Sequence, residues 1–140
     1  AGGLRWLERF VKVYPNIVSV SNRTKQELIS RFGVKESKIR VIYNGLDHSL
    51  YFPGKKDDEP LILWIGRLKR YKNPIDAAKI YLHLSPEVRK RSRLAVIGRG
   101  ELEEEVRREV SNVGGEYLGY VTQEEKVKLY QVAWVVLSAC

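Results

Sequence analysis

The chain has 140 residues, of which 44% are hydrophobic and 30% are charged, and its formal net charge at pH 7 is +8. This balance is typical of a globular domain with a core and excludes a disordered chain. No apolar run approaches the roughly 20 residues that cross a bilayer, and the single cysteine excludes an internal disulfide and a zinc site built from several cysteines.

The positive charge is concentrated in one segment. Residues 67–99 contain ten Lys and Arg against two acidic residues, which accounts for the whole net charge of +8. Such an excess indicates a phosphorylated or polyanionic partner, or a solvated basic surface. Nucleic-acid binding would call for interleaved aromatic residues, and this segment has only Tyr71 and Tyr81. We therefore expect no nucleic-acid partner.

The ends of the sequence indicate a piece of a longer protein. The chain contains no methionine, and an apolar run, Trp134–Leu137, comes just before its end. The first residues lack the basic and apolar regions of a signal peptide, and a cytoplasmic location is the expectation that follows.

Residues 3–60 predict a short α/β unit and a linker. Helical spacing predicts a helix over 3–13, and an apolar run predicts a strand over 17–20. A helix that begins after Ser21 or Asn22 and ends at Gly33 follows. A second strand is predicted over 40–43, and residues 46–60 show no clear period, so they are predicted to be a linker.

Beyond the linker, apolar strands alternate with amphipathic helices. Asn73 is predicted to cap a helix whose first turn holds Pro74, and Thr122 with Glu125 forms a capping box that opens another. The predicted strands cover residues 61–65, 94–97, 116–118 and 134–137. Continuous apolar strands between helices predict a parallel sheet covered on both faces, which is a Rossmann-like α/β fold.

Three predicted loops follow strands and carry glycine. They are Gly66–Lys72, Gly98–Gly100 and Gly119–Val121. Since ligands bind beyond the carboxyl ends of parallel strands, all three loops are expected at the edge of the sheet where a ligand would lie.

The first of these loops has the chemistry of a phosphate site. Arg67 can hold a phosphate through two hydrogen bonds, Lys72 can add a point charge, and a helix N-terminus follows. A pair of surface cations is the alternative. The Gly98-Arg99-Gly100 run fits a dinucleotide motif poorly, because Glu103 stands where its third glycine would be.

Several passages in order resemble one family. The chain is similar to family 4 (group 1) glycosyltransferases in the runs VIYNGLD followed by FP, IGRL followed by KN, VIGRG, GYV, and WVVLS, at residues 41–53, 65–73, 96–100, 119–121 and 134–138. Two prolines of the family pattern are replaced here by Tyr43 and Leu137.

The resemblance implies a two-domain GT-B architecture with a nucleotide sugar bound between two Rossmann-like domains. Residues 1–52 would be the end of the acceptor-side domain and the crossover. Residues 53–140 would be the first part of the donor-binding domain. The family's E-x7-E segment would lie beyond Cys140, so this piece alone is expected to be inactive.

The resemblance also implies a set of site residues. Arg67 and Lys72 are implied to be catalytic, because they would bind the donor's diphosphate. The implied donor-binding residues are Gly66, Gly98, Gly100, Tyr120, Val121, Gln123, Lys126 and Ser138. No metal and no cofactor are implied.

The expected function is transfer of a hexosyl group from a UDP- or GDP-linked sugar to an unknown acceptor, with retention. A related sugar-nucleotide epimerase and a non-catalytic domain that binds nucleoside diphosphates are the alternatives. The basic run Arg89–Arg93 is either a solvated surface, which we favour, or a peripheral contact with anionic lipid.

Overall fold

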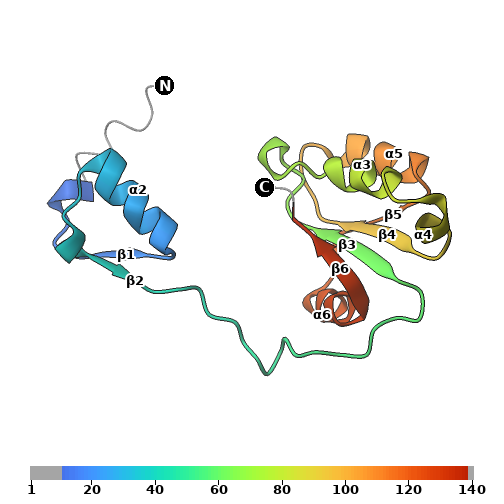
Figure 1. Ribbon diagram of the computed structural model, residues 1–140, viewed down its shortest axis with the longest axis horizontal. Coiled ribbons are helices and arrows are strands. Elements are labelled where there is room, and N and C mark those ends of the chain that lie inside the picture. The colour runs from blue at the N-terminus through green and yellow to red at the C-terminus, as the bar shows by residue number, and fades with distance from the viewer. Residues whose placement is uncertain (1–10, 139–140) are drawn as a thin grey trace. The chain divides into compact units, whose positions relative to one another are not determined.

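The structure, a computed structural model, describes residues 11–138. It divides into two compact units, one up to Asp47 and one from His48 onward (Figure 1). Of the helix predicted over 3–13, residues 11–13 are helical, and the remainder lies outside the described residues. The predicted domain boundary between residues 52 and 53 stays a prediction.

The first unit pairs two parallel strands beside one helix. Strand β1 (Ile17–Ser19) pairs in register with β2 (Ile39–Val41), and helix α2 (Asn22–Phe32) lies between them in the chain. The side chain of Ser21 accepts a hydrogen bond from the Thr24 N–H, and Gly33 ends the helix in the left-handed conformation. Both predicted helix ends are therefore confirmed, and the two strands lie within a residue or two of their predicted bounds.

The second unit is built on a four-stranded parallel sheet of order β5-β4-β3-β6 (Figure 1). Its elements are β3 (Leu61–Ile65), α3 (Asp76–Leu82), α4 (Pro86–Lys90), β4 (Arg93–Ile97), α5 (Glu103–Asn112), β5 (Glu116–Gly119), α6 (Gln123–Val132) and β6 (Ala133–Leu137). The parallel α/β sheet predicted from the apolar strands is confirmed.

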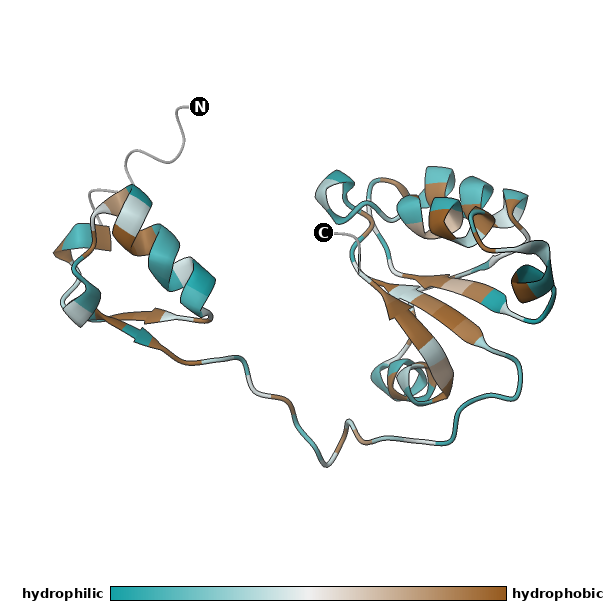
Figure 2. Cartoon of the chain, in the orientation of Figure 1, coloured by the Kyte–Doolittle hydropathy of each residue, from teal (hydrophilic) through white to brown (hydrophobic). Residues whose placement is uncertain are grey.

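Alternate side chains of β3 supply two cores, one on each face of the sheet. Ile62 and Trp64 join the core under α3 and α5, whereas Leu61 and Leu63 join the core under α6. The central strands are apolar along most of their length, and the outer faces of α3 and α5 are largely hydrophilic (Figure 2). Burial on both faces explains why these strands read as continuous apolar runs.

The start of α3 differs from the prediction. Ile75 occupies the N-cap position without a side-chain hydrogen bond, and the helix begins at Asp76. Asn73 instead adopts a left-handed conformation with φ 45° and ends the short 3-10 helix Arg70–Lys72. Asparagine tolerates this conformation better than most residues, which suits it to the bend after the loop.

The burial of strand β6 differs from the prediction. The side chains of Trp134, Val135 and Val136 are 55%, 48% and 47% exposed. Within residues 11–138 this strand pairs only with β3, so the expectation of a sheet covered on both faces holds for β3 and β4 but not here.

No helix in the described part of the chain is both long and apolar enough to cross a membrane.

Candidate functional site

The three predicted loops lie together at the carboxyl edge of the second unit's sheet. The N–H of Gly66 donates to the carbonyl of Ile97 at 3.1 Å, and the N–H of Gly98 donates to that of Gly119 at 2.8 Å. The N–H of Leu68 also donates to the carbonyl of Arg99 at 3.0 Å. The expectation that the loops share one edge is therefore confirmed.

Two glycines make this close approach of the loops feasible. Gly98 has φ 146°, and a Cβ there would overlap the carbonyl oxygen of Gly66. A Cβ at Gly100 would overlap the carbonyl oxygen of Leu68. Both glycines thus have a packing role in this structure, and their predicted contacts with a donor stay predictions.

The two cations predicted to bind phosphate meet at one aromatic ring. Arg67 donates a hydrogen bond from Nη2 to the hydroxyl of Tyr71 at 2.7 Å, and its guanidinium lies 6.0 Å from the ring centroid. The Nζ of Lys72 lies 5.5 Å from the same centroid. Tyr71 therefore holds both positive charges on the loop that follows β3.

A cavity of about 230 Å³ lies beside this loop, at the carboxyl ends of β3 and β6. Among the predicted site residues, Gly66, Lys72 and Ser138 line it. Tyr130 of α6 also lines it, and burial raises the pKa of its hydroxyl. The cavity thus joins an ammonium group, hydroxyl groups and a glycine backbone, which are suited to an oxyanion.

A neighbouring cation on the loop is neutralised. Lys69 forms an ion pair with Glu101, with 3.1 Å between Nζ and Oε2. The hydrogen bond from Lys69 lowers the pKa of the Glu101 carboxyl, so this carboxyl is ionised at neutral pH. The basic run after β3 therefore contains a structural pair as well as the cations at Tyr71.

The loop after β5 presents an aromatic ring to solvent. Tyr120 is 68% exposed, and the guanidinium of Arg99 lies 5.1 Å from its ring centroid. Val121 packs against the core under α6, so any ligand contact from it would come from its backbone. Arg99 was not among the predicted site residues, although its place between two glycines after a strand was visible in the sequence.

The remaining predicted residues, at the start of α6, contact a residue that was not predicted to belong to the site. The Nε2 of Gln123 donates to the hydroxyl of Tyr51 at 2.6 Å. The Nζ of Lys126 lies 6.0 Å from the Tyr51 ring centroid. Tyr51 belongs to the segment predicted as a linker and is 72 residues from Gln123, so no local pattern could reveal the contact.

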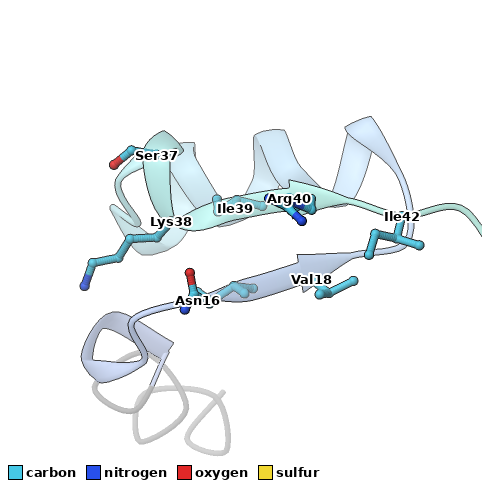
Figure 3. Close-up of a pocket in the computed structure, with 8 residues that line it drawn as sticks. Asn16, Val18, Ser37, Lys38, Ile39, Arg40 and Ile42 are labelled. Carbon is cyan, nitrogen blue, oxygen red and sulfur yellow. The ribbon is translucent and has the colours of Figure 1, made fainter.

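A larger cavity lies in the first unit and contains none of the predicted site residues. It has a volume of about 480 Å³, and β1, β2 and the turn before β2 line it. Figure 3 shows its lining, including Val18, Lys38 and Ile42. Among residues 11–138, no group of three or more His, Cys, Asp or Glu side chains is arranged to hold a metal ion.

The chain matches two family models in succession. Residues 2–50 match the model of Glycosyltransferase Family 4, and residues 51–140 match that of Glycosyl transferases group 1. The second match covers more than half of the chain, so the chain belongs to the group 1 glycosyltransferases.

Curated relatives agree with this family. An uncharacterized glycosyltransferase of Methanocaldococcus jannaschii is 28% identical over 141 residues, which cover 86% of this chain and 35% of that protein. An alpha-1,4-N-acetyl-D-galactosaminyltransferase of Campylobacter jejuni is 30% identical over 135 residues, covering 94% of this chain and 36% of that protein. The chain thus spans about a third of the length of these relatives.

Solved structures share the fold. A glycosyltransferase from Rickettsia africae superposes with a TM-score of 0.73 at 18% identity, covering 96% of this chain and 41% of that one. The pneumococcal O-GlcNAc transferase GtfA, solved with UDP and GlcNAc, gives a TM-score of 0.62 at 14% identity, and the match covers 97% of this chain and 28% of that one. The fold is the Rossmann-like α/β fold of GT-B glycosyltransferases. These comparisons do not favour the epimerase or the non-catalytic alternative.

Proposed function

We propose that this chain forms part of a retaining glycosyltransferase that moves a hexosyl group from a nucleoside-diphosphate sugar to an acceptor. The observation that carries the proposal is the placement of Lys72 in a cavity with Gly66 and Ser138, with Arg67 held beside it at Tyr71. Membership of the group 1 family supplies the class of reaction.

In this proposal the two cations act on the leaving group. As the bond between the sugar and the diphosphate breaks, negative charge grows on the departing phosphate oxygen. Arg67 and Lys72 would then stabilise the transition state more strongly than the bound donor, which is the requirement for catalysis. We propose that these fixed cations do this without a metal ion or a cofactor.

The nucleobase would lie at the loop after β5 and the start of α6. Tyr120 offers an exposed ring there, and the backbone of Val121 and the amide of Gln123 offer hydrogen-bonding groups. A solved structure that shares the fold contains UDP, which supports UDP as the first nucleotide to test, with GDP as the second.

The charge pattern of the basic run supports a solvated surface over a lipid contact. The guanidinium of Arg93 is paired with Asp57 at 2.7 Å and with Glu59 at 3.8 Å. Lys90 and Arg91 are the exposed cations of the run. Peripheral membrane contact and a cytoplasmic location stay proposals, which co-sedimentation with anionic vesicles and cell fractionation would test.

The reaction can be tested on the full-length protein with a panel of UDP- and GDP-linked sugars and glycan acceptors. We expect release of the nucleoside diphosphate only when an acceptor is present, an unchanged rate with EDTA, and a product whose NMR spectrum shows the donor's anomeric configuration.

The proposed roles of the cations have a matched control. Arg67→Ala with Lys72→Ala should lower the rate of transfer at least a hundredfold. Lys90→Ala with Arg91→Ala removes the same charge from the other end of the sheet and should leave the rate unchanged. Donor turnover without an acceptor would contradict the proposal in favour of an epimerase or hydrolase.

A further inference from the structure

Tyr51 makes three separate contacts with α6. Its hydroxyl accepts a hydrogen bond from Gln123 Nε2 at 2.6 Å, and Lys126 Nζ lies 6.0 Å from its ring centroid. Its ring meets that of Tyr130 edge-on, with the centroids 6.2 Å apart and an angle of 67° between the ring planes. One side chain of the preceding segment therefore contacts residues from the first and the last turns of α6.

Tyr130 connects this contact to the cavity that contains Lys72. Tyr130 lines the cavity that Gly66, Lys72 and Ser138 also line, and it lines a second cavity, of about 200 Å³, with Tyr51. Tyr130 thus borders both cavities. The Tyr51 ring packs against Tyr130, and Tyr130 lines the cavity proposed for the diphosphate. A shift of the Tyr51 ring would therefore allow Tyr130 to move and change the shape of that cavity.

The segment after Tyr51 is held against α6 and β6 by backbone and side-chain hydrogen bonds. Gln131 Nε2 donates to the carbonyl of Phe52 at 3.4 Å, Lys56 Nζ donates to the carbonyl of Ala133, and the Asp57 N–H donates to that of Val132 at 3.2 Å. Trp134 Nε1 donates to the carbonyl of Asp57 at 2.7 Å. Tyr51 therefore belongs to a docked segment rather than to a free linker.

We propose that Tyr51 is a positioning residue for the donor site. Its hydroxyl fixes the amide of Gln123 on the side proposed for the nucleobase, and its ring supports Tyr130 on the side proposed for the diphosphate. This inference rests on the proposed function, because it assigns Tyr51 to the same donor site.

The two contacts can be separated by binding measurements on the full-length protein. Calorimetry would compare the nucleoside diphosphate that binds best, UDP or GDP, with inorganic pyrophosphate. Tyr51→Phe removes the hydroxyl but keeps the ring, so binding of the nucleoside diphosphate should weaken about fivefold, the effect of one neutral hydrogen bond, while pyrophosphate binding is unchanged. Tyr51→Ala also removes the ring and should weaken both ligands.

Tyr43→Phe is the matched control. The Tyr43 hydroxyl likewise accepts an amide hydrogen bond, from Asn22 Nδ2 at 3.0 Å, but it lies in the first unit. This substitution should change neither ligand's affinity. Thermal denaturation of each variant would show whether it folds, and Tyr51→Phe keeps the test decisive if Tyr51→Ala does not.

Three results would overturn the inference. If Tyr51→Phe binds both ligands as the unaltered protein does, while Arg67→Ala with Lys72→Ala binds neither, Tyr51 has no positioning role and the proposed function stands. If Tyr51→Phe weakens both ligands equally and lowers the melting temperature, its role is structural. If the unaltered protein binds neither ligand, the inference and the proposed function both fail.

Discussion

Gly98 is the residue at which the geometry of the site is least tolerant of change. Its φ of 146° is strained for any side chain, and a Cβ would overlap the Gly66 carbonyl. Gly98→Ala should therefore lower the free energy of unfolding by about 3 kcal/mol, measured by urea denaturation. Gly45→Ala is the control, because a Cβ there meets nothing within 4 Å. Equal denaturation midpoints for the two variants would contradict this assignment.

Two lysines of the same loop should differ in function because they differ in partners. Lys69 is paired with Glu101, whereas Lys72 lines the cavity with Ser138. Lys72→Ala should raise the donor's KM about tenfold or more, since a charge-assisted hydrogen bond contributes about 1.5–3 kcal/mol. Lys69→Ala should change KM less than about twofold, because an exposed ion pair contributes little. Initial-rate measurements on the full-length protein would check this order, and the reverse order would contradict it.

At the scale of elements, the capping box of α6 makes stability depend on pH. The Thr122 backbone N–H and hydroxyl donate to Glu125 and lower the pKa of its carboxyl from the ordinary value of 4.5. A carboxyl whose folded pKa is lowered stabilises the fold above its unfolded pKa, and the contribution is lost as pH falls through the folded pKa.

Glu125→Gln tests this dependence. The unaltered protein should have a higher urea midpoint than the variant at pH 7, and the difference should shrink as the pH falls below 4.5, the carboxyl's ordinary pKa. A difference that stays constant from pH 7 to pH 3 would show that the ionised carboxylate contributes nothing to the cap.

Elements with a strong apolar pattern were predictable from the sequence, and contacts distant in sequence were not. The bounds of β3 coincide with the apolar run Leu61–Ile65, because burial on both faces requires apolar residues throughout. The prediction for Asn73 was wrong, since Asn-Pro suits an N-cap as well as a bend and only packing separates the two. The contact of Tyr51 with Gln123 could not be predicted, because it produces no periodic pattern in the sequence.

For the candidate site too, the positions of the loops were predictable from the sequence and the contacts of single side chains were not. The alternation of strands and helices predicts parallel strands whose carboxyl ends share one edge, so the sequence could bring Arg67, Gly98 and Tyr120 to that edge, whereas the strand order β5-β4-β3-β6 was not predicted. The partners of each side chain could not be predicted, because ion pairs such as Lys69 with Glu101 depend on rotamers and on loop geometry. For Arg67 and Lys72 the spacing left two interpretations open, a phosphate site and a pair of surface cations, and the resemblance to a family favoured the phosphate site.

At the scale of the whole molecule, the chain spans about 35% of the length of the relative from Methanocaldococcus jannaschii. We propose that the acceptor site and the rest of the donor site belong to the full-length protein. What the described second unit supplies is the edge at which Arg67 and Lys72 lie, together with the docked segment that includes Tyr51.

The most direct test of the central claim is calorimetric titration of UDP, GDP and ADP into the full-length protein and into its Arg67→Ala/Lys72→Ala variant. The claim predicts that one diphosphate binds the unaltered protein and that the variant loses about 3 kcal/mol of binding free energy, roughly a hundredfold in affinity. Equal affinities for the two proteins would contradict the assignment of Arg67 and Lys72 to the donor's diphosphate.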